Sequence, residues 1–455
     1  MSNFGELKIE GRVATPSDAD WDEARLAWNL AADLQPSAVA FVESAEDVAA
    51  TVAFAVANGL RVSGQGTGHG AAPLPSLEGT ILIKTAAMRG IEIEAEARSA
   101  RVEAGVLSIE LGEAAGAHGL CGMPGSSPDV GVVGYTLGGG LSWLGRKHGF
   151  ACNRVIAIEL VSAEGDPRTV DAENGADLFW ALRGGGGGYA IVTALHIALL
   201  PIAEVYGGIL IFPAEVGAEA VRAYRDWTTT VPEEVSSVVR FITPPPIPDV
   251  PEPLRGTPLL TIDAGVCVGS EAEGEELIAP LRQIGEPIMD TFAWMPTAGL
   301  SRIHMDPENP VPGIGEGGTV AELPDEAIDA WVGVVGPGSG SPLLLSELRH
   351  LGGALGRPDP NGGALSKIDA GFVRYSIGMP MTPELGAALP GYLDKVDEAM
   401  RPWAGEGGYY NFTEGPCDVD KILPPDVCAR LAEVKRAWDP EGRVVGNHSV
   451  SLGEA

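Results

Sequence analysis

The sequence predicts an α+β protein with two structurally different regions. Between residues 36 and 200, short β runs are linked by few helices and by two glycine-rich loops. From about residue 204 to 400, strand candidates alternate with longer helix candidates, and this mixture indicates an α+β domain built on an antiparallel sheet. Pro201 stands where the texture changes, so we expect a domain boundary at about residue 203.

A β-α-β unit is the clearest local pattern in the first region. Ala38–Val42 is a short apolar run typical of a strand. Ser44 can cap the following helix, and Asp47 three residues later resembles a capping box. The helix should end at Gly59, because the apolar positions at helical spacing stop there: Val48, Val52, Ala55 and Val56. Leu60–Ser63 then follows as a second strand.

The remaining elements are expected from apolar patterning and turn residues. In the first region we expect the strand Ile81–Lys84, a hairpin over Ile91–Val106, helices at Ser108–His118 and Asp177–Arg183, and β structure at Val155–Val161 and Tyr189–Leu200. In the later part we expect strands at Gly207–Phe212, Val238–Ile242 and Leu259–Val266, and helices at Val216–Thr228, Glu271–Ile284, Pro383–Met400 and Pro425–Trp438.

Glycine-rich loops follow the strands of the first region. GQGTGHG, residues 64–70, comes directly after a strand, where glycines let backbone N–H groups approach an anion. Unlike a dinucleotide-binding Rossmann unit, it opens no helix, and no acidic residue stands where the ribose would need one. A second glycine region spans 124–145, and five glycines follow at 184–188. Either loop alone fits a tight turn, but two strand-linked loops within ~80 residues favour a cofactor cradle.

His69 is the one side chain of the first loop suited to chemistry. A lone histidine is more often structural or exposed than functional. Here it lies at the end of a strand, among glycines that need no packing side chain, in a loop suited to a pyrophosphate. These three features favour a functional histidine without defining its role.

Composition excludes several classes of protein. The formal net charge of −32 leaves no basic footprint for nucleic acid and would repel an anionic membrane surface. The five cysteines are scattered without a C-x-x-C pair, so we expect neither a metal site nor a disulfide framework. The N-terminus lacks a basic segment followed by an apolar one, and the most apolar stretch, 189–213, is interrupted by His196, Pro201 and Glu204. We therefore expect a cytoplasmic protein with no nucleic-acid or membrane partner.

Several ordered motifs give the chain a family resemblance. GLRVSGQGTGHG resembles the FAD-binding loop of the vanillyl-alcohol oxidase / para-cresol methylhydroxylase superfamily, and the chain is most similar to its berberine bridge enzyme-like members. The other supporting segments are Pro124–Val155, Asp177–Leu195, Tyr409–Phe412 and Val434–Val450. The resemblance implies a two-subdomain FAD-binding domain of the para-cresol methylhydroxylase type over 1–203, a substrate-binding domain over 204–404, and a return of 405–455 to the first domain.

The resemblance also implies how the cofactor is held. In the family, a histidine of the first loop bonds covalently to the 8α-methyl group of FAD, and His69 matches it. Many relatives add a link from a cysteine of the second loop, but Ser127 stands there, so we expect a single covalent bond. The first loop departs from the commoner R-S-G-G-H form. The further cofactor-binding residues expected are Gln65, Gly66, Thr67, Gly68, Gly70, Gly125, Ser127, Val130, Gly131, Gly134, Tyr135, Ile191, Asn411 and Asn447.

The activity implied is hydride transfer to FAD from a small organic substrate of the alcohol, sugar, alkaloid or polyketide type. Tyr409, Asn411 and, more weakly, Tyr375 are the catalytic candidates. Tyr409 is either a base, which requires a lowered pKa, or an aromatic wall and hydrogen-bond donor. Val130 resembles the residue of the oxidases, which favours O2 as acceptor and H2O2 as product, although it also fits ordinary packing. A dehydrogenase with another acceptor and a non-catalytic flavin-binding protein are the alternatives; the intact loops, Tyr409 and Asn411 argue against the second.

Overall fold

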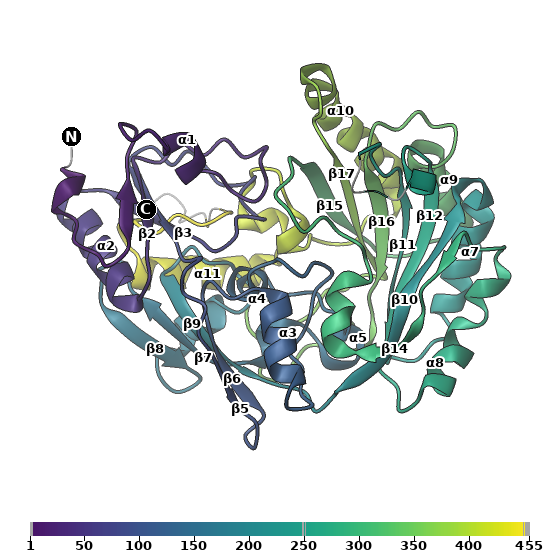
Figure 1. The fold of residues 1–455 in the computed structure, drawn as a ribbon, viewed down its shortest axis with the longest axis horizontal. Coiled ribbons are helices and arrows are strands. Elements are labelled where there is room, and N and C mark those ends of the chain that lie inside the picture. The colour runs from purple at the N-terminus through teal and green to yellow at the C-terminus, as the bar shows by residue number, and fades with distance from the viewer. Residues whose placement is uncertain (1–2, 248–249, 251, 449, 451–455) are drawn as a thin grey trace.

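The computed structural model describes residues 3–247, 250, 252–448 and 450, and these form three β-sheets with helices packed against them (Figure 1). Two sheets lie in the N-terminal part of the chain and the third takes all its strands from residues 204–378. The α+β fold that the sequence predicts is confirmed. Among the described residues, no helix combines the length and apolar character needed to cross a lipid bilayer.

The first sheet contains the predicted β-α-β unit. Its strands are β1 (Arg12–Ala14), β2 (Ala38–Phe41), β3 (Arg61–Gln65) and β4 (Thr80–Lys84), in the order β1-β2-β4-β3. β2 and β3 both run parallel to β4, which lies between them, and α2 (Ala45–Ala57) makes the crossover. The short helix α1 (Trp21–Ala24) lies between β1 and β2 in the chain.

The helix caps of α2 follow the predicted pattern in part. The Ser44 side chain accepts the backbone N–H of Asp47 at 3.2 Å, as expected for an N-cap. The Asp47 carboxylate does not complete a capping box; it accepts the backbone N–H groups of Glu10, Gly11 and Glu43 instead. It thereby fixes the N-terminal segment to the start of the helix.

The second sheet is antiparallel and follows directly. It contains β5 (Ile91–Glu94), β6 (Ser99–Glu103), β7 (Val155–Val161), β8 (Pro167–Asp171) and β9 (Ile191–Ala198), in the order β5-β6-β9-β7-β8. The connections carry α3 (Ser108–Gly116), α4 (Val132–Leu137), α5 (Gly145–His148) and α6 (Ala176–Ala181). The helix α4 forms inside the second glycine region, where the sequence analysis expected none.

The third sheet is an eight-stranded antiparallel sheet. Its strands run in the order β13-β10-β12-β11-β16-β17-β15, and β14 also pairs with β10. Their bounds are β10 (Glu204–Pro213), β11 (Val235–Ile242), β12 (Leu259–Val266), β13 (Met289–Asp290), β14 (Ala293–Pro296), β15 (Ile314–Val320), β16 (Leu345–His350) and β17 (Phe372–Gly378).

Four helices cover one face of the eight-stranded sheet (Figure 1). They are α7 (Gly217–Thr228), α8 (Glu271–Ile278), α9 (Asp325–Val335) and α10 (Pro383–Met400). The apolar pattern predicted a single helix over Glu271–Ile284, but α8 ends at Ile278 and a separate 3-10 turn follows at Leu281–Gln283. Pro280 explains the break, because proline has no N–H to continue the helix.

The C-terminal segment returns to the first two sheets, and Figure 1 shows it in yellow among the N-terminal elements. The helix α11 (Pro425–Trp438) precedes a bridge between Val444 and Val62 of β3. Lys435 is buried and donates to the backbone carbonyls of Val444, at 2.9 Å, and of Gly188 in the five-glycine run.

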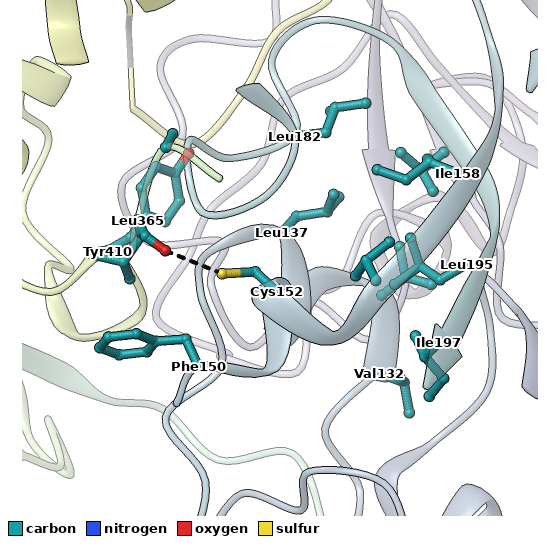
Figure 2. Packing of buried hydrophobic residues seen from close by; sticks show 14 of the residues in the cluster. Val132, Leu137, Phe150, Cys152, Ile158, Leu182, Leu195, Ile197, Leu365 and Tyr410 are labelled. Carbon is teal, nitrogen blue, oxygen red and sulfur yellow. Dashed lines mark hydrogen bonds between the residues drawn. The ribbon is translucent and has the colours of Figure 1, made fainter. Parts of the chain in front are cut away.

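A large hydrophobic core joins these distant segments (Figure 2). Leu365 and Tyr410 pack there with Leu137, Phe150 and Cys152, and the Cys152 thiol lies 3.4 Å from the Leu365 carbonyl oxygen. This core fixes the C-terminal segment against the second glycine region, and so it shapes the cavity described next.

Candidate functional site

A cavity of about 420 Å³ lies where the two glycine loops, the eight-stranded sheet and the C-terminal segment meet. All but one of the predicted site residues line it. They are Gln65, Gly66, Thr67, Gly68, His69, Gly70, Gly125, Ser127, Val130, Gly131, Gly134, Tyr135, Tyr375, Tyr409, Asn411 and Asn447.

Ile191 is the exception. Its side chain is 3% exposed and belongs to the core beneath the first sheet, away from the residues that line the cavity. A methyl group placed on Gly64 would lie 3.6 Å from its Cδ1, so Ile191 packs behind the first loop. The structure therefore assigns Ile191 a supporting place and not the expected lining position.

His69 is held on three sides. Its Nδ1 lies 2.8 Å from the Thr67 hydroxyl, and its Nε2 lies 3.5 Å from Oδ1 of Asp129. Its ring stacks on Trp28, whose indole N–H donates to the same carboxylate. A carboxylate opposite Nε2 favours the tautomer with its proton there, so that Nδ1 is unprotonated. The lone pair of Nδ1 accepts a hydrogen bond from the Thr67 hydroxyl and can form a covalent bond once that hydrogen bond is given up.

Asp129 and Trp28 are functional candidates that the sequence analysis missed. Burial alone would raise the pKa of Asp129, but hydrogen bonds and charge from His69, with hydrogen bonds from Ser127 and Trp28, hold it below its usual value. The Ser127 hydroxyl donates to Asp129 at 2.8 Å. Asp129 is the only acidic residue of its loop, which was an available signal; Trp28 precedes the loop in another segment and gave none.

The second loop approaches the C-terminal segment closely. A Cβ on Gly138 would lie 1.8 Å from Oδ1 of Asn411, so only glycine lets Asn411 occupy this place. Asn411 donates to the Tyr135 carbonyl at 2.9 Å and to the Tyr409 hydroxyl at 3.1 Å. Around Gly134, by contrast, a Cβ would meet no heavy atom of the described chain within 4 Å, so this position opens on the cavity.

The chemistry of the cavity wall fits FAD. Four buried polar atoms of the lining residues have no hydrogen-bond partner among the described residues: Gln65 Oε1, Tyr135 Oη, Arg154 Nε and Glu414 Oε2. A fifth, His69 Nε2, has only the 3.5 Å contact with Asp129. Buried polar atoms normally find partners, so unpaired ones beside a glycine cradle indicate a polar ligand. FAD offers phosphate, hydroxyl and ring-edge groups to such a wall.

Tyr409 is fully enclosed at the far side of the cavity. Its side chain is 2% exposed, and its hydroxyl oxygen accepts the backbone N–H of Leu141 at 2.7 Å and the amide of Asn411. Burial raises the pKa of Tyr409 well above its ordinary value, and these two hydrogen bonds offset only part of that effect. The geometry favours the interpretation of Tyr409 as wall and hydrogen-bond donor over that of a base.

Tyr375 pairs with a carboxylic acid that the sequence analysis did not single out. Its hydroxyl donates to Oε1 of Glu414, and its ring stacks on Phe412 with centroids 4.8 Å apart. Burial raises the pKa of Glu414 to about 7. Glu414 follows Asn411 by three residues in the motif GYYNFTEG, so its place in the sequence was a usable signal.

Successive side chains of a strand point to opposite faces, and on β16 the charged ones face the cavity. Glu347 and Arg349 line the cavity, whereas Leu348 packs under the helices. Arg349 donates to Glu347 at 2.6 Å and to Ser126 at 3.3 Å, and its guanidinium lies 4.8 Å from the centre of the Phe412 ring.

His304 extends this charged group into the interior. It contacts Asp263 through Nδ1 and Glu347 through Nε2, the latter at 3.0 Å. Burial and Arg240 would lower the pKa of His304, but the surrounding carboxylates raise it overall. Burial would raise the pKa of Glu347, but Arg349 and His304 outweigh it and lower that pKa. The members come from separate segments, so no local pattern predicted the cluster.

Comparison with known proteins gives the cavity its context. Residues 36–171 match the FAD binding domain family. The chain is 27% identical to (R)-6-hydroxynicotine oxidase of Paenarthrobacter nicotinovorans over 462 residues, which cover 98% of this chain and 97% of that protein.

Solved structures agree with this relationship. The wild-type berberine bridge enzyme-like protein 1 of Physcomitrella patens superposes with a TM-score of 0.84 at 20% identity, covering 98% of both chains. A glucooligosaccharide oxidase from Acremonium strictum gives a TM-score of 0.77 at 21% identity, covering 97% of both. The chain therefore contains an FAD binding domain, is an FAD-dependent oxidoreductase, and shares the fold of the berberine bridge enzyme-like structures.

Proposed function

We propose that this protein is an oxidase that carries FAD on a single covalent bond to His69, removes a hydride from a small organic substrate, and passes the electrons to O2 to give H2O2. The observation that carries this proposal is the clamp on His69: Trp28 stacks on the ring, and Asp129 lies opposite Nε2. A histidine held in one orientation with Nδ1 available is suited to a covalent bond.

One feature supports a histidyl bond, and two support its being the only bond. The FAD of the Acremonium strictum oxidase is a 6-S-cysteinyl, 8α-N1-histidyl FAD. The N1 atom of that histidine corresponds to Nδ1 of His69. Ser127 occupies the loop position that resembles the family's second attachment point. Cys121 does line the cavity, but burial raises its thiol pKa to about 12, so it stays protonated and a poor nucleophile.

FAD, when bound, supplies the two-electron acceptor, and the chain's residues orient the substrate. Leu141 and Asn411 occupy the lone pairs of the Tyr409 oxygen, so the hydroxyl proton of Tyr409 is left to donate toward the cavity. Phe412 and Tyr375 form an aromatic wall on the sheet side. Tyr409 would thus hold an oxygen or nitrogen of the substrate, while the wall excludes water.

Val130 supports O2 as the acceptor. Its side chain lines the cavity, and its carbonyl accepts the Ser108 N–H at 2.9 Å, which fixes the loop. The family resemblance connects a small side chain at this place with reaction with O2. The alternative is an FAD-dependent dehydrogenase that passes electrons to a quinone or a protein.

Reoxidation kinetics decide between these two activities. The holoprotein is photoreduced without oxygen and then mixed with air-saturated buffer in a stopped-flow instrument. An oxidase regains its flavin absorbance rapidly and releases one H2O2 per flavin. Slow reoxidation, with rapid turnover on an artificial quinone acceptor, would establish the dehydrogenase instead. A protein whose flavin is bleached by no alcohol, sugar or amine would be a non-catalytic binder.

A further inference from the structure

Glu414 is a partly buried acid that lines the cavity, and no cation of the described residues pairs with it. Its Oε1 accepts the Tyr375 hydroxyl, while its Oε2 is buried without a hydrogen-bond partner among the described residues. No ion pair joins its carboxylate to a lysine, arginine or histidine of the described chain. Glu347, another carboxylate of the cavity wall, is by contrast paired with Arg349 and His304.

The strand beneath Glu414 is adapted to hold it. A Cβ on Gly315 of β15 would lie 2.8 Å from the Tyr375 hydroxyl oxygen and 3.0 Å from Glu414 Oε2. On Gly317 it would lie 2.6 Å from the Phe412 carbonyl oxygen. Two glycines in one short strand therefore let the segment from Phe412 to Glu414 lie directly on the sheet, with the Glu414 carboxyl beside the Tyr375 hydroxyl.

The groups around Glu414 raise or lower its pKa. Burial has the largest effect and raises the pKa, so Glu414 exchanges its proton near neutral pH. Tyr375 faces it from β17, and its hydrogen bond favours the ionised form. Glu316 of β15 disfavours that form by like charge, and its own oxygens accept the N–H groups of Gly317 and Gly415. On β16, Arg349 is already paired with Glu347.

We propose that Glu414 accepts the hydroxyl or amine proton of the substrate during oxidation, with Tyr375 as the positioning residue that holds its carboxylate. This rests on the proposed oxidase function. For an alcohol, the O–H bond breaks, the proton passes to the Glu414 carboxylate, and the O–H electron pair becomes the second bond of the carbonyl. The C–H bond breaks in the same step, and its hydrogen leaves with both electrons to the oxidant that the FAD-dependent activity supplies. Glu414 then returns its proton to solvent after the carbonyl product leaves.

Tyr409 complements this role rather than competing with it. Its oxygen already accepts two hydrogen bonds, so it offers a proton and does not collect one. Glu414 has the opposite property, because its Oε2 has no partner and its charge no counter-ion among the described residues. Tyr409 and Glu414 together imply a substrate whose reacting carbon carries an O–H or N–H group. A substrate without such a group has no proton for Glu414 to accept.

The test is the pH dependence of anaerobic flavin reduction, measured by stopped flow with the alcohol or amine of a screening panel that bleaches the wild-type flavin fastest. The ionised acid is the active form, so the rate should rise with pH through about 7 and level off above it. In E414Q the rate should fall about 100-fold or more and lose this rise. E414D should recover part of the rate and part of its rise with pH. E308Q, at an exposed surface glutamate, is the matched control and should behave as wild type.

Y375F separates positioning from mere packing. Losing the hydrogen bond destabilises the ionised acid, so the rise should move to higher pH while the plateau stays within a few-fold of wild type. Retention of the wild-type rate and pH profile in E414Q would overturn the proposal for Glu414, and an unmoved profile in Y375F would overturn that for Tyr375. Equal FAD content and thermal midpoints confirm that the variants fold. A wild-type flavin that no donor bleaches would instead refute the oxidase function, and this inference with it.

Discussion

The imidazole of His69 lies flat against the indole of Trp28, with 4.0 Å between ring centroids and 18° between ring planes. The same indole donates to Asp129, and Asp129 lies opposite Nε2 of His69. Two side chains from separate segments thus fix the plane and the tautomer of one histidine. Such an arrangement is needed where a histidine forms a bond at one nitrogen only.

Asp129→Asn should impair covalent attachment while leaving FAD binding intact. The amide can still contact Nε2, but it no longer favours the tautomer with a free Nδ1. We expect attachment to be about 10- to 100-fold slower, the usual effect of removing a partner that orients a histidine. Acid precipitation at set times after adding FAD to the apoprotein measures it. Asp129→Glu should restore part of the rate, whereas attachment at the wild-type rate in Asp129→Asn would exclude this role.

Ser127→Cys should create a second attachment to FAD. The Ser127 side chain lines the cavity beside Asp129, at the place that resembles the family's cysteine. Peptide mapping of the denatured holoprotein should then find the peptides of positions 69 and 127 joined through one flavin. If the new thiol reacts freely with iodoacetamide in that denatured protein, the assignment of Ser127 is wrong.

Tyr409→Phe should slow flavin reduction about 10- to 100-fold without removing its pH dependence near neutrality. It should also lower the free energy of unfolding by about 1–3 kcal/mol, because the buried N–H of Leu141 loses its acceptor. Stopped-flow reduction and urea unfolding measure the two effects. Loss of the pH dependence in this variant would identify Tyr409, rather than Glu414, as the base.

Val130→Leu should affect the oxygen reaction alone. The larger side chain would fill part of the cavity where we propose that the flavin binds, so we expect reoxidation by O2 to slow about 100-fold, or about 2.7 kcal/mol in barrier. Anaerobic reduction by substrate should stay within a few-fold of wild type. Equal loss in both half-reactions would show that the substitution disturbs the site generally.

The Glu347 cluster should make stability depend on pH. The pKa of Glu347 is lowered in the folded protein, so its contribution is present above the unfolded value of about 4.3 and is lost as the pH falls below it. Thermal midpoints of the apoprotein should therefore fall between pH 6 and pH 3, and less steeply in Glu347→Gln. That variant should also lose about 3–5 kcal/mol at neutral pH, because Arg349 would stay buried without its partner. An unchanged midpoint would show that the cluster is solvated.

The sequence predicted those parts of the site that lie in continuous motifs. The loop around His69 and the segment around Tyr409 each carry their residues together, and both line the cavity. Trp28, Asp263 and His304 reach the site from segments with no motif of their own, so only the fold brings them in. Ile191 lies in a matching motif, but the motif did not reveal that its side chain points into the core.

The fold shows the same division between local and long-range information. Ser44 and Gly59 marked the ends of α2, because caps are local signals. β15, with the sequence IGEGGTV, was not predicted, since glycine is uncommon in strands. Its glycines make room for Phe412 and Glu414, a reason that exists only in the folded chain. The exact domain limits, at residues 1–203, 204–404 and 405–455, remain predictions from the sequence.

The covalent bond at His69 is tested most directly by mass. The holoprotein is denatured, freed of loose cofactor by precipitation, and weighed intact and as peptides, with His69→Ala as the control. The proposed bond predicts a chain heavier by one FAD, a yellow pellet, and flavin on the His69 peptide alone. Recovery of all FAD in the supernatant, from holoprotein shown to contain it, would contradict the bond.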